Sequence, residues 1–231
     1  MSAVDHVVEC AFDATFSPVI RAALFDFGGV ILSSPFEAFA RYERERGLAD
    51  GFLRRLNSTR PDENAWAQLE RGHVSFDAFC RLYEGEALAA GGEVDAREVM
   101  ALLAGDVRPA MVEAVRRCHE RLKTACLTNN WVRADDGGAA PHEGLLADLF
   151  DVVVESSKVG VRKPDPRFYE LACEQLAIEP REAVFLDDIG GNLKPARAMG
   201  MTTIKVDDPD AAIGELESVV GFPLRSPDVS R

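Results

Sequence analysis

Three short apolar runs in this chain of 231 residues end abruptly in polar side chains that could do chemistry. The runs, with the residues that follow them, are Ala22 to Phe25 before Asp26, Thr124 to Leu127 before Thr128 and Asn129, and Ala183 to Leu186 before Asp187 and Asp188. A fourth stretch, residues 160–166, carries Lys163 in a loop that precedes a predicted helix. Ligands of open parallel sheets bind beyond the carboxyl ends of the strands, so we expect these side chains to meet at one site.

The acidic members of this set could bind a metal ion and supply a nucleophile. Several carboxylates at one site repel each other unless a cation shares them. Asp26, Asp187 and Asp188 offer hard oxygen ligands, which suit Mg²⁺ better than zinc. A carboxylate beside such a metal can also be a nucleophile, as in enzymes that form an aspartyl phosphate.

The other members of the set suit an anionic substrate. Thr128 offers a hydroxyl, and the backbone beside Asn129 can offer N–H groups to phosphate oxygens. Lys163 supplies positive charge for an anionic substrate or transition state. Gly28 and Gly29 let the backbone turn tightly directly after the first aspartate.

Each of these residues also has a purely structural interpretation. Asp26 is compatible with a helix or turn cap, and Asp187-Asp188 with the N-cap of the following helix. Thr128 is compatible with a plain strand end, and Lys163 with a solvated lysine. The four sites occur in order along one parallel-sheet pattern, and this combination favours the functional interpretation.

Strands that alternate with helices along the chain predict an α/β fold with a parallel sheet. Strands are predicted at 22–25, 124–127, 150–154, 183–186 and 202–206, and helices at 111–122, 166–176 and 193–199. The first twenty residues show no clear period and are interpreted as an extra edge strand or a loosely held arm. Residues 131–142 are interpreted as a loop near the site entrance or, preferably, as an ordinary solvent loop.

The stretch after the first strand has helical spacing and is too long for an ordinary connection of roughly 2–6 residues. We therefore predict a core domain of residues 1–33 and 107–231, with a helical domain inserted at 34–106. Within the insert, Pro61 is expected to open one helix and Ser75 to cap another. Asp95 and Glu98 have capping-box spacing and are expected to open a further helix. Four aromatic residues of the insert are expected to belong mostly to its core rather than to a cavity wall: Tyr42, Trp66, Phe79 and Tyr83.

Composition argues against several classes of function. The chain carries 26 Lys and Arg against 39 Asp and Glu, a formal net charge of −13, whereas nucleic acids and anionic membranes attract basic patches. No apolar run approaches the ~20 residues of a membrane span, and no secretory-signal pattern is present. The 5 cysteines lack zinc spacing, which favours free thiols in a reducing cytosol. We expect a cytoplasmic monomer or homodimer.

The four sites resemble, in the family's order, the motifs of the haloacid dehalogenase-like (HAD) hydrolase superfamily. The matching stretches are Phe25-Asp26-Phe27-Gly28-Gly29-Val30, Leu127-Thr128-Asn129, Lys163-Pro164 and Phe185-Leu186-Asp187-Asp188. Residues 185–197 more specifically resemble the N-terminal phosphatase domain of soluble epoxide hydrolases and its bacterial relatives. The resemblance implies a Rossmann-like parallel sheet with an inserted small α-helical cap.

The resemblance also implies a metal site and a nucleophile. Asp26 would be the nucleophile and a Mg²⁺ ligand, together with the backbone carbonyl of Gly28 and the carboxylate of Asp188. Asp187 would complete this acidic site, orienting Lys163 or a metal-bound water.

On the phosphate side, the resemblance implies that Thr128 and Asn129 hold the phosphate, with Gly28 nearby. Lys163 would neutralise charge between the phosphate and the nucleophile. The implied partner is a small phosphorylated substrate.

One residue departs from the phosphatase pattern Asp-x-Asp, because its second position here is Gly28. The missing Asp normally protonates the leaving group and later activates water. Loss of positioned acid–base help typically costs roughly 10²–10⁴-fold in rate. The loss matters least for leaving groups that need no proton, such as those of acyl or aryl phosphates.

Three hypotheses follow. The first is a Mg²⁺-dependent phosphatase that acts on a small phosphorylated metabolite through an aspartyl phosphate. The second is a catalytically impaired module that binds a phosphorylated ligand or has a regulatory role. The third, ranked lowest, is a dehalogenase-type hydrolase, which needs no metal and would leave the Asp187-Asp188 pair without a purpose.

Overall fold

The computed structural model describes residues 19–131 and 143–225. Our interpretations of the first residues and of 132–142 concern segments outside these ranges. Within the described ranges, none of the helices combines the length and the apolar character needed to cross a membrane. The cysteines described there are buried free thiols, as predicted: Cys80, Cys118, Cys126 and Cys173.

The centre of the molecule is a five-stranded sheet in the order β3-β2-β1-β4-β5, and every paired neighbour is parallel. The strands are β1 (Ala22–Phe25), β2 (Lys123–Thr128), β3 (Val152–Glu155), β4 (Ala183–Asp187) and β5 (Thr202–Lys205). The parallel α/β fold predicted from the sequence is confirmed. Strand β1 occupies the middle of the sheet and is buried along its whole length, as its unbroken apolar sequence predicts.

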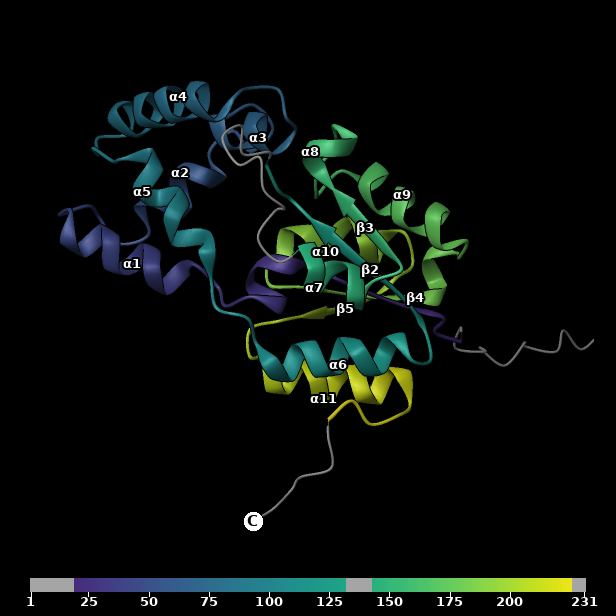
Figure 1. The fold of residues 1–231 in the computed structure, drawn as a ribbon. Helices are drawn as coiled ribbons and strands as arrows, with labels where there is room; N and C mark the ends of the chain where they lie inside the picture. Colours follow the sequence, from purple (N-terminus) through teal and green to yellow (C-terminus); the bar gives the residue numbers. More distant parts are fainter. Residues whose placement is uncertain (1–18, 132–142, 226–231) are drawn as a thin grey trace, which may run out of the picture.

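Helices cover both faces of the sheet (Figure 1). One face packs against α6 (Pro109–His119) and α11 (Pro209–Val220), and the other against α9 (Pro166–Leu176) and α10 (Gly190–Ala198). Alternate side chains of β1 point to the two layers, because Ala23 and Phe25 belong to one apolar cluster and Ala22 and Leu24 to the other. Two short helices, α7 (Glu143–Leu149) and α8 (Ser156–Val159), flank β3 in the sequence.

A separate group of helices follows β1 and lies beside one end of the sheet (Figure 1). It consists of α1 (Phe36–Glu45), α2 (Phe52–Ser58), α3 (Ala65–Glu70), α4 (Phe76–Ala89) and α5 (Ala96–Ala101). These helices surround an apolar cluster of their own, in which Tyr42, Phe79 and Tyr83 are buried. The Trp66 ring packs on the rings of Phe79 and Tyr83, so the aromatic residues serve as core, as predicted.

Two adjacent connecting segments, one before and one after this helical group, join it to the sheet domain. Leu32 forms an isolated antiparallel bridge with Val107, and the Ser33 N–H donates to the Asp106 carbonyl at 2.8 Å. The Ser33 hydroxyl in turn accepts from the Asp106 N–H at 2.9 Å. These hydrogen bonds hold the two connecting segments, which we call the two crossings, to each other directly after the turn that follows β1.

Local signals located several helix starts correctly, but α3, α6 and α10 start elsewhere than predicted, α6 at Pro109 rather than at residue 111. Ser75 caps α4 and Asp95 caps α5, as predicted. Helix α3 begins after Asn64 rather than at Pro61, because the Asn64 side chain accepts from the Ala67 N–H. The buried Asn64 amide also donates to two carbonyls of the preceding turn, which fixes the start there. Helix α10 begins at Gly190, three residues before the predicted start at Leu193.

A buried ion pair joins the helical group to the core. The Arg162 Nε lies 2.7 Å from the Glu70 Oε2 of α3, and both side chains are largely buried. Glu70 also accepts from the Trp66 indole N–H at 2.9 Å, and Arg162 donates to the Pro61 carbonyl at 2.9 Å. Burial raises the pKa of the Glu70 carboxyl, and Arg162 counteracts that rise. Because Arg162 directly precedes Lys163, the contact between the two parts adjoins a candidate site residue.

We predict that Arg162→Leu destabilises the protein by about 3–5 kcal/mol, because it leaves the Glu70 carboxylate buried without its cation. The double variant Glu70→Leu/Arg162→Leu should recover most of that loss. Urea denaturation measures both changes. The matched control is Arg167→Leu, because the ion pairs of Arg167 with Glu170 and Glu174 are exposed and should contribute no more than about 1 kcal/mol. Equal stability of the Arg162 and Arg167 variants would contradict the prediction.

Candidate active site

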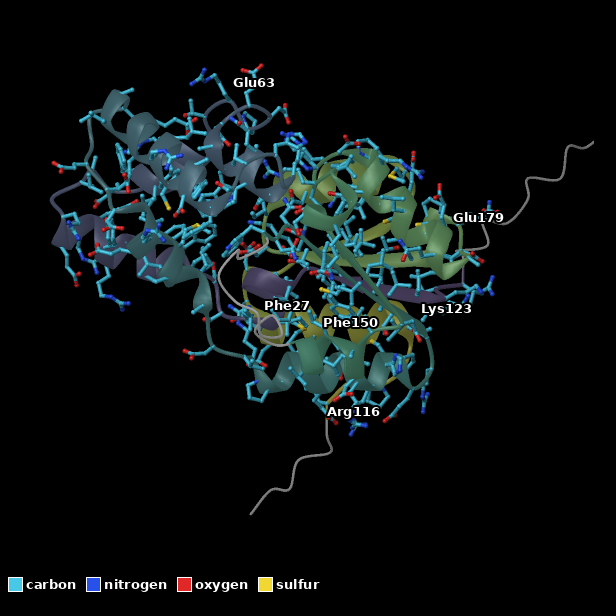
Figure 2. All side chains as sticks on the ribbon, turned by 45° about the horizontal axis from the view of Figure 1, so that its top comes forward. Phe27, Glu63, Arg116, Lys123, Phe150 and Glu179 are labelled. Carbon is cyan, nitrogen blue, oxygen red and sulfur yellow. The ribbon has the colours of Figure 1, made fainter. Side chains whose placement is uncertain are left out.

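The carboxyl ends of the parallel strands face the helical group. Figure 2 shows Phe27, just beyond the end of β1, on the side towards that group, and Lys123, at the start of β2, at the opposite end of the sheet. Asp26, Thr128 and Asp187 terminate β1, β2 and β4 or directly follow them. The structure therefore brings the sequence-predicted residues to one edge of the sheet.

The Lys163 ammonium is the centre of this site. It lies 2.8 Å from the Asp26 Oδ1 and 2.8 Å from the Asp187 Oδ2. Only 1% of the residue is exposed, and the ammonium also lies 5.6 Å from the centre of the Phe185 ring. Burial lowers the pKa of Lys163, but the two carboxylates raise it more, so the net shift is upward and the side chain stays charged.

Asp187 has most of its acceptor positions occupied. Besides the lysine, it accepts from the Ile189 N–H at 2.7 Å and from the Asn192 amide at 3.1 and 3.0 Å. The Asn192 carbonyl accepts from the buried Tyr169 hydroxyl at 2.6 Å. This network aims Asp187 at Lys163 and the first turn of α10. Sequence reasoning assigned no role to Asn192, although its place one turn into a helix after an aspartate was visible.

Asp26 both caps a turn and faces the site, so the two interpretations of this residue from the sequence are compatible. Its Oδ1 accepts from the Phe27 N–H at 2.6 Å, and its own N–H donates to the Leu186 carbonyl at 2.9 Å. The side chain thus caps the turn Phe27–Ile31 while facing Lys163. Burial raises the pKa of Asp26 well above its usual range, Lys163 opposes this, and the neighbouring carboxylates add to it.

The two glycines after Asp26 differ in their surroundings. Gly29 has a φ of +78°, and a Cβ on it would lie 2.1 Å from the Asp188 Oδ2. Gly28 has a φ of −70° and a ψ of 132°, which any residue adopts, and a Cβ on it would meet no atom within 4 Å. Only Gly29 is required by the backbone and by the approach of Asp188.

The acidic residues form a group that suits a divalent cation. Asp26, Asp187 and Asp188 each offer a carboxylate oxygen, and the three oxygens lie within 4.8 Å of one another. Burial, followed by the charge of Asp187, raises the pKa of Asp188 to about 6. Three carboxylates face one buried ammonium, so negative charge is left uncompensated. An all-oxygen set with this charge fits Mg²⁺, and Asp26 and Asp188 have more free acceptor capacity for it than Asp187.

Thr128 and Asn129 lie at the end of β2, and Asn129 holds the lysine loop. Its Oδ1 accepts from the Lys163 N–H at 2.9 Å, and its Nδ2 donates to the Lys163 carbonyl at 3.1 Å. Both ends of the amide are thereby used to position Lys163, which leaves the backbone beside Asn129 as its contribution to an anion site. Thr128 is largely buried at the carboxyl end of β2.

Arg108 is a site residue that sequence reasoning missed. It lies at the second crossing between the two parts, and its guanidinium donates to the Gly29 carbonyl at 2.6 Å. Its backbone N–H donates to the Ile31 carbonyl at 2.9 Å, so it holds the turn after Asp26 from both ends. Its charge also lowers the pKa of Asp188, although less than burial raises it. No local pattern marks such a contact, because the residues are 79 positions apart in the chain.

This chain is similar to known proteins in sequence and in fold. The model of the haloacid dehalogenase-like hydrolases matches residues 20–200. The acyl-CoA dehydrogenase family member 10 of Mus musculus is 35% identical over 211 residues, which cover 88% of this chain and 19% of that protein. The bifunctional epoxide hydrolase 2 of Sus scrofa is 35% identical over 219 residues, which cover 89% of this chain and 40% of that protein. The chain thus spans less than half the length of these two relatives.

A relative of similar length and a solved structure complete the comparison. The sesquiterpene phosphatase astK of Aspergillus oryzae is 29% identical over 205 residues, 87% of this chain and 97% of that protein. The HAD family enzyme bt-2542 of Bacteroides thetaiotaomicron, solved in complex with magnesium and inorganic phosphate, has a TM-score of 0.52. That structure is 20% identical and covers 80% of this chain and 93% of its own, so it supports the fold alone.

We predict that alanine destabilises the protein at one of the two adjacent glycines and has little effect at the other. Gly29→Ala should destabilise the protein by about 1–3 kcal/mol, because it places a side chain in the left-handed region and against Asp188. Gly28→Ala, its matched control, should change stability by no more than about 1 kcal/mol. Chemical denaturation of both variants checks this. Equal stability of the two variants would contradict the prediction, because the turn after Asp26 would then accommodate a side chain at position 29.

We further predict that Mg²⁺ stabilises the folded protein against heat, because it relieves the repulsion among the carboxylates. At a concentration about 100 times the dissociation constant, the gain should be about 2.7 kcal/mol. Asp188→Asn should abolish most of this gain, and NaCl at equal ionic strength should not reproduce it. Thermal unfolding with and without Mg²⁺ tests the effect, and equal stabilisation by NaCl contradicts it.

Proposed function

This chain belongs to the haloacid dehalogenase-like hydrolases, and we propose that it is a Mg²⁺-dependent phosphatase for a small phosphorylated metabolite. The proposal rests on one observation above all: Lys163 bridges Asp26 and Asp187 within a group of three carboxylates that a dication would neutralise. This arrangement combines a nucleophile with the positive charge that a phosphate needs. An acidic protein can accept an anionic substrate only where such local charge overcomes the general repulsion.

In the proposed reaction, a carboxylate oxygen of Asp26 attacks phosphorus, the bond from phosphorus to the leaving-group oxygen breaks with its electron pair on that oxygen, and an aspartyl phosphate forms. Lys163 balances negative charge between the nucleophile and the phosphate, while Thr128 and the backbone beside Asn129 hold the phosphate oxygens. Mg²⁺, held by Asp26, Asp188 and the Gly28 carbonyl, would neutralise phosphate charge when bound. Water then attacks phosphorus, the bond from phosphorus to the Asp26 oxygen breaks, inorganic phosphate leaves, and Asp26 regains its carboxylate.

We propose that the two structural parts divide this work. Residues 1–33 and 107–231 would form the catalytic core, and residues 34–106 would form a cap that selects the substrate and excludes water. The Glu70–Arg162 ion pair supports this view, because it joins the cap to the residue before the catalytic lysine. The buried aromatic residues of the cap hold it together and would not face the substrate.

A similar protein supports a phosphatase activity. The relative from Aspergillus oryzae, whose length this chain covers to 97%, is named a sesquiterpene phosphatase. A dehalogenase activity is less well supported, because it would leave the negative charge of the acidic group without a partner. A module that only binds a phosphorylated ligand is the second candidate, and the observation that favours it is the glycine at position 28.

The decisive experiment measures release of inorganic phosphate from a panel of phosphorylated metabolites, with and without Mg²⁺. Asp26→Asn should reduce turnover by on the order of 10⁴–10⁶-fold, as for other residues that form covalent intermediates. Asp165→Asn is the matched control, because Asp165 only caps α9 and asparagine caps equally well. Its activity should equal that of the natural protein.

Three outcomes would contradict the proposal. Turnover that survives Asp26→Asn or complete chelation would exclude the nucleophile or the metal. Binding of phosphorylated metabolites without any turnover would favour the binding module. Halide release from a 2-haloacid in the absence of metal would favour the dehalogenase.

A further inference from the structure

Gly28 is not a glycine that the fold requires. Its backbone angles are open to any residue, it is exposed, and an added Cβ would have free space around it. Its neighbour Gly29 is the opposite case, with a positive φ and Asp188 in contact with the position of its absent Cβ. An aspartate at position 28 would therefore fit, and the lack of an acid there is a chemical property of the site rather than a consequence of packing.

Other groups near Asp26 already have fixed partners. The charged groups that act most strongly on Asp26 are Lys163, Asp187 and Asp188. The Lys163 ammonium pairs with two carboxylates, and Asp187 accepts hydrogen bonds from the lysine and from the Ile189 N–H. Asp188 packs against Gly29 and belongs to the proposed metal site. Each of these groups is thus already engaged by a neighbouring side chain, by the backbone or by the proposed metal site.

We propose, on the basis of the phosphatase function above, that the natural substrate is an acyl phosphate, whose leaving group departs as a carboxylate without protonation. In the first step a bond forms between an Asp26 oxygen and phosphorus, the bond from phosphorus to the acyl oxygen breaks, and its electron pair leaves on the carboxylate. No proton moves. One acyl phosphate replaces another, so the step requires little driving force and no acid at position 28.

The second step returns the enzyme to its starting state. Water attacks the phosphorus of the aspartyl phosphate, the bond to Asp26 breaks, its electron pair stays on the Asp26 carboxylate, and the proton of water passes to solvent. Since position 28 offers no base, this step limits turnover of activated substrates. Such substrates should show a burst of leaving group equal to the enzyme concentration.

The test compares kcat/KM, which reports the first step, across leaving groups of different acidity. Acetyl phosphate, a series of substituted aryl phosphates and glycerol phosphate serve as probes, with Mg²⁺ present. The natural protein should show a steep decline in kcat/KM as the leaving group becomes more basic. In Gly28→Asp, the ratio of kcat/KM for glycerol phosphate to kcat/KM for acetyl phosphate should rise by about 10²-fold or more, the lower end of general acid catalysis. In the matched variant Gly28→Asn the ratio should stay unchanged.

The outcomes separate this inference from the function on which it rests. If all probes fail with Mg²⁺, the phosphatase function fails and this inference with it. If the probes react but kcat/KM does not depend on leaving-group acidity, only the acyl phosphate assignment is overturned. The same holds if Gly28→Asn raises the ratio as much as Gly28→Asp. The series on the natural protein keeps the test valid even if a variant does not fold.

Discussion

The burial of one ammonium group between two carboxylates determines the arrangement of this site. A charged lysine can leave water only if its partners stay in place, because the desolvation of an unpaired charge costs several kcal/mol. Lys163 therefore needs Asp26 from β1 and Asp187 from β4 at fixed positions, and each partner has its own support. Asn129 clamps the lysine backbone and Asn192 orients Asp187. The parallel register of β1 and β4 supplies the spacing on which these contacts depend.

The sequence predicted the positions of the site better than the contacts within it. Unbroken apolar runs followed by polar residues marked the strand ends, and parallel strands bring such ends together whatever the rest of the chain does. Asn129 shows the limit of this reasoning, because its side chain binds the lysine loop 34 positions away in the chain. Arg108 and Asn192 are similar cases. Their roles depend on which atoms tertiary packing places within reach, and no local spacing expresses that.

Helix starts show the same division between local and tertiary information. Ser75 and Asp95 could be identified because capping is a contact within three residues, and the structure agrees. Pro61 was a reasonable start for α3, but the buried Asn64 makes hydrogen bonds both backward and forward that a proline cannot make. The Asn64 side chain makes three such hydrogen bonds, so this more fully bonded residue determines where the helix starts.

Adjacent glycines in the turn after Asp26 carry different information, although the sequence presents them as a pair. Replacing the hydrogen of Gly29 would displace Asp188, so this glycine exists for geometry. Gly28 has ordinary backbone angles and open space, so geometry gives no reason for its lack of a side chain. Where the fold accepts any residue, only the reaction can account for the residue that is present. A carboxylate at position 28 would change which leaving groups can depart, and the substrate class that we propose follows from its absence.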